Sequence, residues 1–111
     1  MILDQVTKMF PNIKIFSHAY DYPRPLVGNG KYIGKYLRKL EIPDKLMKPI
    51  MSETIERMNK VIEDVTRNYK SASLLNFRGA TDPYTWHDDM HPGDDGFRVL
   101  AQKFEDAMYQ G

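Results

Sequence analysis

Hydrophobic residues recur at helical spacing in three segments of the chain. The longest stripe predicts an amphipathic helix near residues 44–69, with charged residues on its opposite face and Asp44 as its cap. Shorter stripes predict helices near 2–9 and 95–109. The stripe of the long helix consists of Met51, Ile55, Met58, Ile62, Val65 and Tyr69. The same spacing is compatible with a short coiled coil, but a helix packed on a sheet is the commoner use of such a stripe.

Two short segments favour β-strands instead. Residues 13–16 alternate and are rich in β-branched and aromatic side chains, and residues 73–77 form a second apolar run. A strand, a long helix and a second strand predict a right-handed βαβ unit with parallel strands. The loops that leave both strands then emerge at one edge of the sheet, where ligands bind in α/β proteins. We therefore expect one α/β domain over residues 1–111.

Composition narrows the possible functions. The 111 residues include 16 basic and 15 acidic side chains, so the net charge of +1 gives no electrostatic case for binding nucleic acid or an anionic membrane. There is no cysteine, which excludes disulfides and cysteine-based zinc sites. No apolar run approaches the ~20 residues that cross a bilayer. The first residues do not read as a secretory signal, so a cytoplasmic location is the default expectation unless an N-terminal signal has been lost.

The region from Lys31 to Lys48 combines six basic residues with tyrosines, a composition also found on nucleic-acid-binding faces. The nearly neutral total favours a solvated, partly packed face instead. Residues 28–31 read Gly-Asn-Gly-Lys, but no Gly-Lys-Ser/Thr follows, so they do not predict a phosphate loop.

Candidate chemistry is concentrated in residues 86–97, which crowd two histidines and four carboxylates around Pro92-Gly93. An aspartate three residues before a histidine can hold the imidazole in one tautomer and stabilise its protonated form. We therefore take Asp88 and His91 as the candidate acid and base. The alternatives are that these residues form only a turn and a helix cap, or that His87, Asp88, Asp89 and His91 bind a divalent metal. The tight spacing argues against four converging ligands, so no metal is expected.

A second set of candidates follows the first predicted strand. His18, Tyr20 and Asp21 lie in a segment rich in proline and glycine, and they are candidates for lining a substrate pocket beside Asp88 and His91. The alternative is that the tyrosine packs on the prolines and Asp21 caps a turn.

The residues around these candidates resemble the last conserved block of the SGNH (GDSL-type) esterases and lipases. In this chain the block reads Asn76-Phe77-Arg78-Gly79-Ala80, then Trp86 to Pro92, then Gly96-Phe97. A looser match reads His18-Ala19-Tyr20-Asp21-Tyr22-Pro23, with Ala19 in place of the usual glycine. The resemblance implies a three-layer flavodoxin-like fold, of which this chain would be the C-terminal part, and it implies that Asp88 and His91 belong to a Ser-His-Asp triad.

The family's nucleophile and oxyanion blocks are absent from this sequence. The resemblance therefore implies a chain that supplies the acid and base, takes a small ester substrate without a cofactor, and depends on the missing N-terminal half or a second copy of itself. Ser17 alone stands at a favourable strand end, and none of the serines lies in a nucleophile-like turn. The alternative is a non-catalytic α/β interaction domain that dimerises or swaps elements through unpaired sheet edges.

Overall fold

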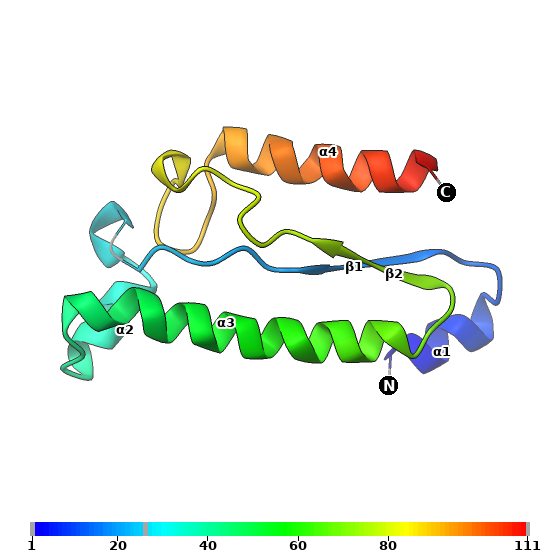
Figure 1. Ribbon diagram of the computed structural model, residues 1–111, viewed down its shortest axis with the longest axis horizontal. Coiled ribbons are helices and arrows are strands. Elements are labelled where there is room, and N and C mark those ends of the chain that lie inside the picture. Colours follow the sequence, from blue (N-terminus) through cyan, green and yellow to red (C-terminus); the bar gives the residue numbers. More distant parts are fainter. Residues whose placement is uncertain (1, 26, 111) are drawn as a thin grey trace.

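The described residues form a mixed α/β structure (Figure 1). A computed structural model describes residues 2–25 and 27–110 of the chain. In chain order the elements are α1 (Ile2–Met9), β1 (Ile15–Ala19), the 3₁₀ helix η1 (Val27–Gly30), α2 (Ile33–Lys39), α3 (Asp44–Arg67), β2 (Ala72–Asn76), the 3₁₀ helix η2 (Pro83–Thr85) and α4 (Asp94–Gln110). None of the helices in these ranges is long and apolar enough to cross a membrane.

The two strands form a parallel pair, as the strand-helix-strand order predicts. Their register runs from Ile15 opposite Ala72 to Ala19 opposite Asn76. The predicted bounds of the first strand were wrong: Ile13 lies outside it and is 40% exposed, whereas the polar Ser17 and His18 lie inside it. Those two residues are held in the strand by their pairing with β2, which is a long-range contact that local alternation does not reveal.

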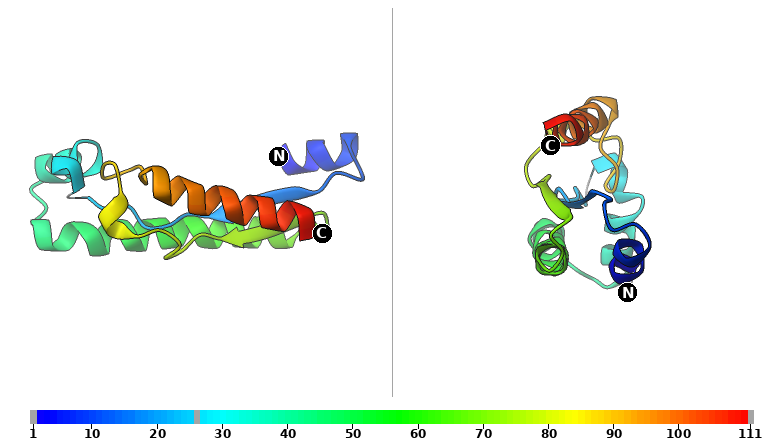
Figure 2. Two further views of the ribbon diagram at one scale, coloured as in Figure 1. Left: turned by 90° about the horizontal axis from the view of Figure 1, so that it is seen from above. Right: turned by 90° about the vertical axis from the view of Figure 1, so that its right-hand side faces the viewer.

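The sheet lies between α3 on one side and α4 on the other (Figures 1 and 2). Successive side chains of β1 point to opposite faces, as the pleat requires. The Ser17 hydroxyl lies 2.6 Å from the Thr66 hydroxyl on α3. The His18 ring instead packs against Phe77 and against Phe104 on α4, with centroid distances of 4.8 and 5.7 Å.

An ionic cluster joins α3 to the turn after β2. The Arg78 guanidinium lies 2.8 Å from a Glu56 carboxylate oxygen and 2.7 Å from one of Glu63, and its side chain is 18% exposed. Hydrogen bonds from Arg78 to Glu56 and then to Glu63 raise the pKa of the guanidinium. The Tyr22 hydroxyl donates to Glu56 at 2.7 Å, so the segment after β1 joins the same cluster. These contacts hold the carboxyl ends of both strands against α3.

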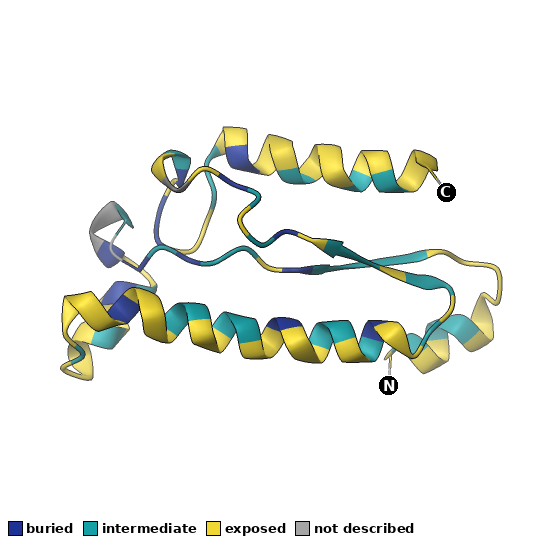
Figure 3. Cartoon of the chain, in the orientation of Figure 1, coloured by how far each residue is buried: buried dark blue, intermediate teal, exposed yellow. Residues whose placement is uncertain are grey.

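The apolar core is small for a chain of this length. Among the described residues, the buried hydrophobic side chains are Ala19, Met47, Phe77 and Trp86. The radius of gyration is 16.4 Å, whereas a compact domain of this length would have about 13 Å. Figure 3 shows that exposed residues cover the outer faces of α3 and α4. The structure is therefore elongated and open rather than closed around one core.

The helices differ from the sequence prediction mainly near residue 40. The helices near 2–9, 44–69 and 95–109 are present as α1, α3 and α4, with ends within two residues. The helix α2 was not predicted. Asp44 does not cap α3 as expected: Pro43 occupies the cap position without a side-chain hydrogen bond, and Asp44 lies in the first turn. An aspartate there still stabilises the helix, because it faces the positive end of the helix dipole.

Candidate active site

The candidate residues lie in the loop between η2 and α4, residues 86–93, next to the start of α2 (Figure 1). The Trp86 indole N–H donates to the Thr81 hydroxyl at 2.8 Å, and the Arg24 guanidinium lies over the Trp86 ring at 5.5 Å. The loop also closes tightly, because a Cβ added to Gly93 would lie 2.0 Å from the Thr85 carbonyl oxygen. Only glycine permits this approach.

Asp89 fastens the loop to α2. Its side chain is fully buried and its carboxylate accepts hydrogen bonds from the backbone N–H groups of Tyr32, Ile33 and Gly34, the last at 2.9 Å. These are donors at the start of α2 that have no partner within the helix, and a carboxylate also faces the positive end of the helix dipole there. Asp89 therefore caps a helix more than fifty residues earlier in the sequence.

The four residues of the metal alternative do not converge in the structure. The carboxylate of Asp89 is occupied by α2, while that of Asp88 faces His91. In the described parts of the chain, no three His, Cys, Asp or Glu side chains are grouped so that they could hold a metal ion.

Asp88 organises the backbone that carries His91. Its carboxylate accepts hydrogen bonds from the backbone N–H groups of Met90 at 2.9 Å and His91 at 2.7 Å. The His91 carbonyl in turn accepts from the His87 N–H at 3.0 Å. An aspartate that bonds the backbone two and three residues later forms a local turn, which is why this spacing places the histidine beside it.

The same carboxylate holds the His91 ring. Nδ1 of His91 lies 2.9 and 3.0 Å from the two carboxylate oxygens of Asp88. The Asp88 side chain is 11% exposed, whereas the His91 side chain is 49% exposed. An ionised carboxylate only accepts hydrogen bonds, so the ring donates Nδ1–H to it and leaves Nε2 as the free acceptor.

The electrostatics favour an ionised Asp88. Burial opposes its charge, but hydrogen bonds from the His91 ring and from two backbone N–H groups outweigh that effect, so the pKa of Asp88 lies below its ordinary value. The pair thus combines a buried anion with a partly exposed base, which is the arrangement that lets an imidazole accept a proton from a hydroxyl.

The His91 ring borders an open pocket of about 480 Å³. The pocket is lined by Thr85, His87, His91, Pro92, Gly93, Asp94 and Phe97. On the α2 side, the Tyr32 ring stands edge-on to the His91 ring with the centroids 5.6 Å apart. No local pattern predicted this contact, because the attachment of α2 to Asp89 brings Tyr32 to His91.

The residues expected to line a substrate pocket after β1 lie elsewhere. His18 and Tyr20 contact each other at 4.6 Å, and the aromatic partner of His91 in the described chain is Tyr32 rather than either of them. The Nδ1 atom of His18 is buried and has no hydrogen-bond partner among the described residues. Neither residue lines the pocket beside His91, and the substrate-binding role of His18 and Tyr20 stays a prediction.

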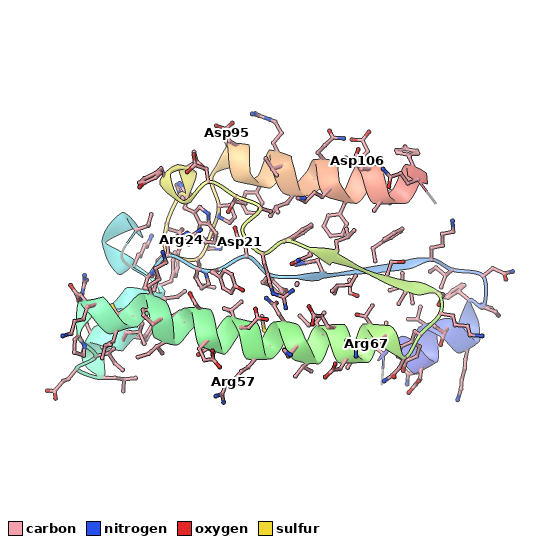
Figure 4. The ribbon with its side chains drawn as sticks, viewed as in Figure 1. Asp21, Arg24, Arg57, Arg67, Asp95 and Asp106 are labelled. Atoms are coloured by element: carbon pink, nitrogen blue, oxygen red, sulfur yellow. The ribbon has the colours of Figure 1, made fainter. Side chains whose placement is uncertain are left out.

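Asp21 ties two loops together (Figure 4). Its carboxylate accepts hydrogen bonds from the Gly79 N–H at 2.8 Å, the Thr81 N–H at 3.2 Å and the Thr81 hydroxyl. It also accepts from the N–H of Tyr22, its own neighbour, at 2.8 Å. These donors match the alternative reading of Asp21 as a turn cap, and they link the segment after β1 to the segment that leads to Trp86.

Ser17, the serine at the end of the first predicted strand, does not lie beside His91 as a nucleophile would. The Ser17 hydroxyl points to α3, where it pairs with Thr66, and the Thr66 hydroxyl donates onward to the Ile62 carbonyl at 2.7 Å.

Comparisons with models of known protein families, with curated proteins and with solved structures find no significant match to this chain.

Proposed function

We propose that this chain supplies the acid and base of an SGNH-type serine esterase that acts on carboxylic or acetyl esters. One observation carries the proposal: the buried Asp88 carboxylate holds Nδ1 of His91 with both oxygens while the ring stays half exposed beside a pocket. The resemblance of residues 76–97 to the last block of that family adds support, as does the parallel pair of strands. As part of the same proposal, the domain that this chain would complete has a three-layer flavodoxin-like fold.

In the proposed reaction, a serine hydroxyl from a completing polypeptide gives its proton to Nε2 of His91 as its oxygen attacks the ester carbonyl. The carbonyl π electrons move to the oxygen, which is held by donors of the completing polypeptide, and Asp88 stabilises the imidazolium. Collapse breaks the bond to the leaving alcohol, which takes the proton from Nε2. Water then hydrolyses the acyl-serine by the same two steps, with His91 again as base and acid.

The exposed position of His91 allows a first test on the chain alone. A neutral imidazole attacks activated esters, so the purified chain should slowly hydrolyse 4-nitrophenyl acetate with a rate that depends on His91. The His91→Ala variant should lose most of that rate. Asp88→Ala should lower it by about tenfold, less than the roughly 10²–10⁴-fold of general acid-base catalysis itself, because Asp88 acts only through the His91 ring. The comparison variant is His87→Ala. His87 is exposed and lines the same pocket, but Asp88 contacts the ring of His91 and not that of His87, so this variant should keep most of the rate.

The second test concerns the nucleophile. A serine-directed fluorophosphonate should leave the chain alone unlabelled, because Ser17 is bonded to Thr66 across the sheet from α4. Labelling should appear on a serine of a completing polypeptide only in the mixture of the two, and should be lost with His91→Ala. A labelled serine in this chain alone, or equal hydrolysis by wild type and His91→Ala, would contradict the proposal.

A second candidate function is association of the chain with a partner or a second copy through the edges of its sheet. The small size of the described sheet favours it. The described sheet has two strands, so each has one outer edge without a neighbouring strand, and the buried apolar core is small. Such edges recruit further strands unless they are covered. Light scattering after size-exclusion chromatography should then show a dimer or larger species, and a compact stable monomer would count against association.

A further inference from the structure

A basic hollow lies on α2, near the candidate active site. It measures about 500 Å³ and is lined by Gly30, Lys31, Lys35, Arg38 and Lys39. Lys35 and Arg38 or Lys39 are three and four positions apart on α2 and share one face of it. Lys31 lies in the turn before α2 and lines the same hollow. None of the five residues that line the hollow is acidic. Arg38 is paired with Asp44, so the positive charges that an anion in the hollow would offset are those of Lys31, Lys35 and Lys39.

The backbone keeps the floor of the hollow open. Gly30 has φ +62°, and a Cβ there would lie 2.6 Å from the Pro25 carbonyl oxygen and 3.8 Å from the Arg38 guanidinium. A larger residue would therefore strain the loop and approach the cation. The Lys39 ammonium lies 5.4 Å from the Tyr36 ring, and Arg38 pairs with Asp44 at 3.7 Å. These contacts restrain two of the cations at the rim.

Tyr32 connects this hollow to His91. The Lys31 ammonium lies 5.4 Å from the centroid of the Tyr32 ring, and the His91 ring stands 5.6 Å from the same centroid. Asp89 fixes the distance between the two sites, because it binds the backbone of Tyr32 and directly follows Asp88. The Tyr32 ring thus contacts both a residue of the hollow and the His91 ring.

We propose that the hollow on α2 binds a phosphate group, and that this phosphate belongs to the ester cleaved at His91. The assignment of this phosphate to the substrate rests on the proposed function. Phosphate binding itself can be measured without any catalysis. Phosphate is favoured over a carboxylate because it carries up to two charges and three acceptor oxygens, which suit the three lysines of the hollow. The ligand is a phosphate monoester with an acyl group at a distance that Tyr32 spans.

The surroundings do not favour a nucleic-acid strand. The Asp89 carboxylate lies at the start of α2, where it accepts from the Tyr32 and Gly34 N–H groups, and Asp94 and Asp95 lie in the first turn of α4. The chain as a whole has a net charge of only +1. A single-stranded nucleic acid is recognised along an extended basic groove with stacking aromatic rings, whereas these basic residues are confined to one short helix.

The test is a titration of the ¹⁵N-labelled chain with glycerol 3-phosphate at low ionic strength. The amide and imidazole resonances are monitored by NMR during the titration. The amide signals of Gly30, Lys31 and Lys35 should shift saturably, with a smaller shift of the His91 ring, and glycerol should cause none. The double variant Lys31→Gln/Lys35→Gln should bind about tenfold more weakly, since each exposed contact to a charged group contributes modestly and additively. Binding should also weaken with salt.

The matched control removes the same charge elsewhere. Lys70 and Lys103 are exposed, and neither lines the hollow. The double variant Lys70→Gln/Lys103→Gln should bind glycerol 3-phosphate like wild type. Equal weakening by both double variants would show a nonspecific charge effect and would overturn the proposal, as would absence of saturable binding.

Two further binding measurements, with lipid vesicles and with an oligonucleotide, identify the source of the phosphate. Vesicles of phosphatidylcholine and phosphatidic acid in a four-to-one ratio should retain the chain, through Lys31 and Lys35, if the phosphate is a lipid headgroup; binding of glycerol 3-phosphate alone indicates a soluble ester. Tighter binding of a single-stranded oligonucleotide than of either probe would contradict the proposal. His91→Ala should leave phosphate binding intact, so loss of ester hydrolysis and loss of phosphate binding remain separate results.

Discussion

The attachment of the candidate loop to α2 depends on one side chain, and its removal has a calculable cost. In Asp89→Ala, three backbone N–H groups of Tyr32, Ile33 and Gly34 lose their carboxylate acceptor in a site where Asp89 is fully buried. Loss of a helix cap alone costs about 1 kcal/mol, and a hydrogen bond to a charged group contributes about 1.5–3 kcal/mol. Because water can reach the exposed part of Tyr32, we expect a total loss of about 3 kcal/mol in the free energy of unfolding, below the sum of three such bonds.

The amide variant separates charge from hydrogen bonding. Asp89→Asn keeps an acceptor oxygen but loses the negative charge at the helix start, so it should cost about 1–2 kcal/mol. Urea unfolding followed by circular dichroism measures both losses, and the fluorescence of Trp86, the single tryptophan, reports on the loop itself. If Asp89→Ala does not fold, Asp89→Asn and the exchange rates of the α2 amides still test the reasoning.

The matched control is Asp95→Ala. Asp95 is exposed at the start of α4 and pairs with Arg98 at 2.8 Å (Figure 4). An exposed pair of this kind contributes about 0.2–1 kcal/mol, so this variant should unfold nearly like wild type. The reasoning is refuted if Asp89→Ala stays within about 0.5 kcal/mol of wild type, the size expected of an ordinary surface change, or if Asp95→Ala costs as much.

Three further predictions follow from the contacts around the site. Arg78→Met should lower the free energy of unfolding by about 1–2 kcal/mol, a range discounted for partial exposure, while Arg57→Met, which removes an exposed pair, should cost under about 0.5 kcal/mol. In Gly93→Ala the new methyl group would clash with the Thr85 carbonyl oxygen, so the loop should move and the fluorescence emission of Trp86 should shift. An unchanged emission spectrum and an unchanged free energy of unfolding would contradict this steric argument. The lowered pKa of Asp88 means that its ionised form stabilises the fold above pH ~4, and that this stability is lost as the pH falls through the lower folded-state value. Unfolding midpoints should therefore fall more steeply on acidification in wild type than in Asp88→Asn, and equal slopes would contradict this.

Local sequence was sufficient for the elements whose signals are local. The stripe from Met51 to Tyr69 predicted α3, and the order of strand, helix and strand predicted a parallel pair. The Asp-x-x-His spacing placed Asp88 and His91 together because the aspartate bonds the backbone two and three residues later. That turn forms without help from distant residues.

The helix α2 could not be predicted because its ends depend on unusual or distant groups. Its start is capped by Asp89, more than fifty residues away. Its end has the bonding of a Schellman motif, with Ile42 N–H to the Leu37 carbonyl and Glu41 N–H to the Arg38 carbonyl, but Glu41 has φ 60° where glycine is usual. Three glycines and two prolines nearby also argued for a loop. The basic residues from Lys31 to Lys48 were recognised in the sequence, but the hollow that residues of α2 and its preceding turn form, and the contact of Tyr32 with His91, depend on this helix and were not predicted.

The tautomer of His91 tests the acid-base pair most directly. Long-range ¹H–¹⁵N spectra of the labelled chain, recorded at a pH where the imidazole is neutral, should show the proton on Nδ1 and a bare Nε2, because Nδ1 lies 2.9 Å from the Asp88 carboxylate. In Asp88→Ala this preference should disappear. A proton on Nε2 in wild type, or the same spectrum in both proteins, would contradict the assignment of Asp88 and His91 as an acid and a base.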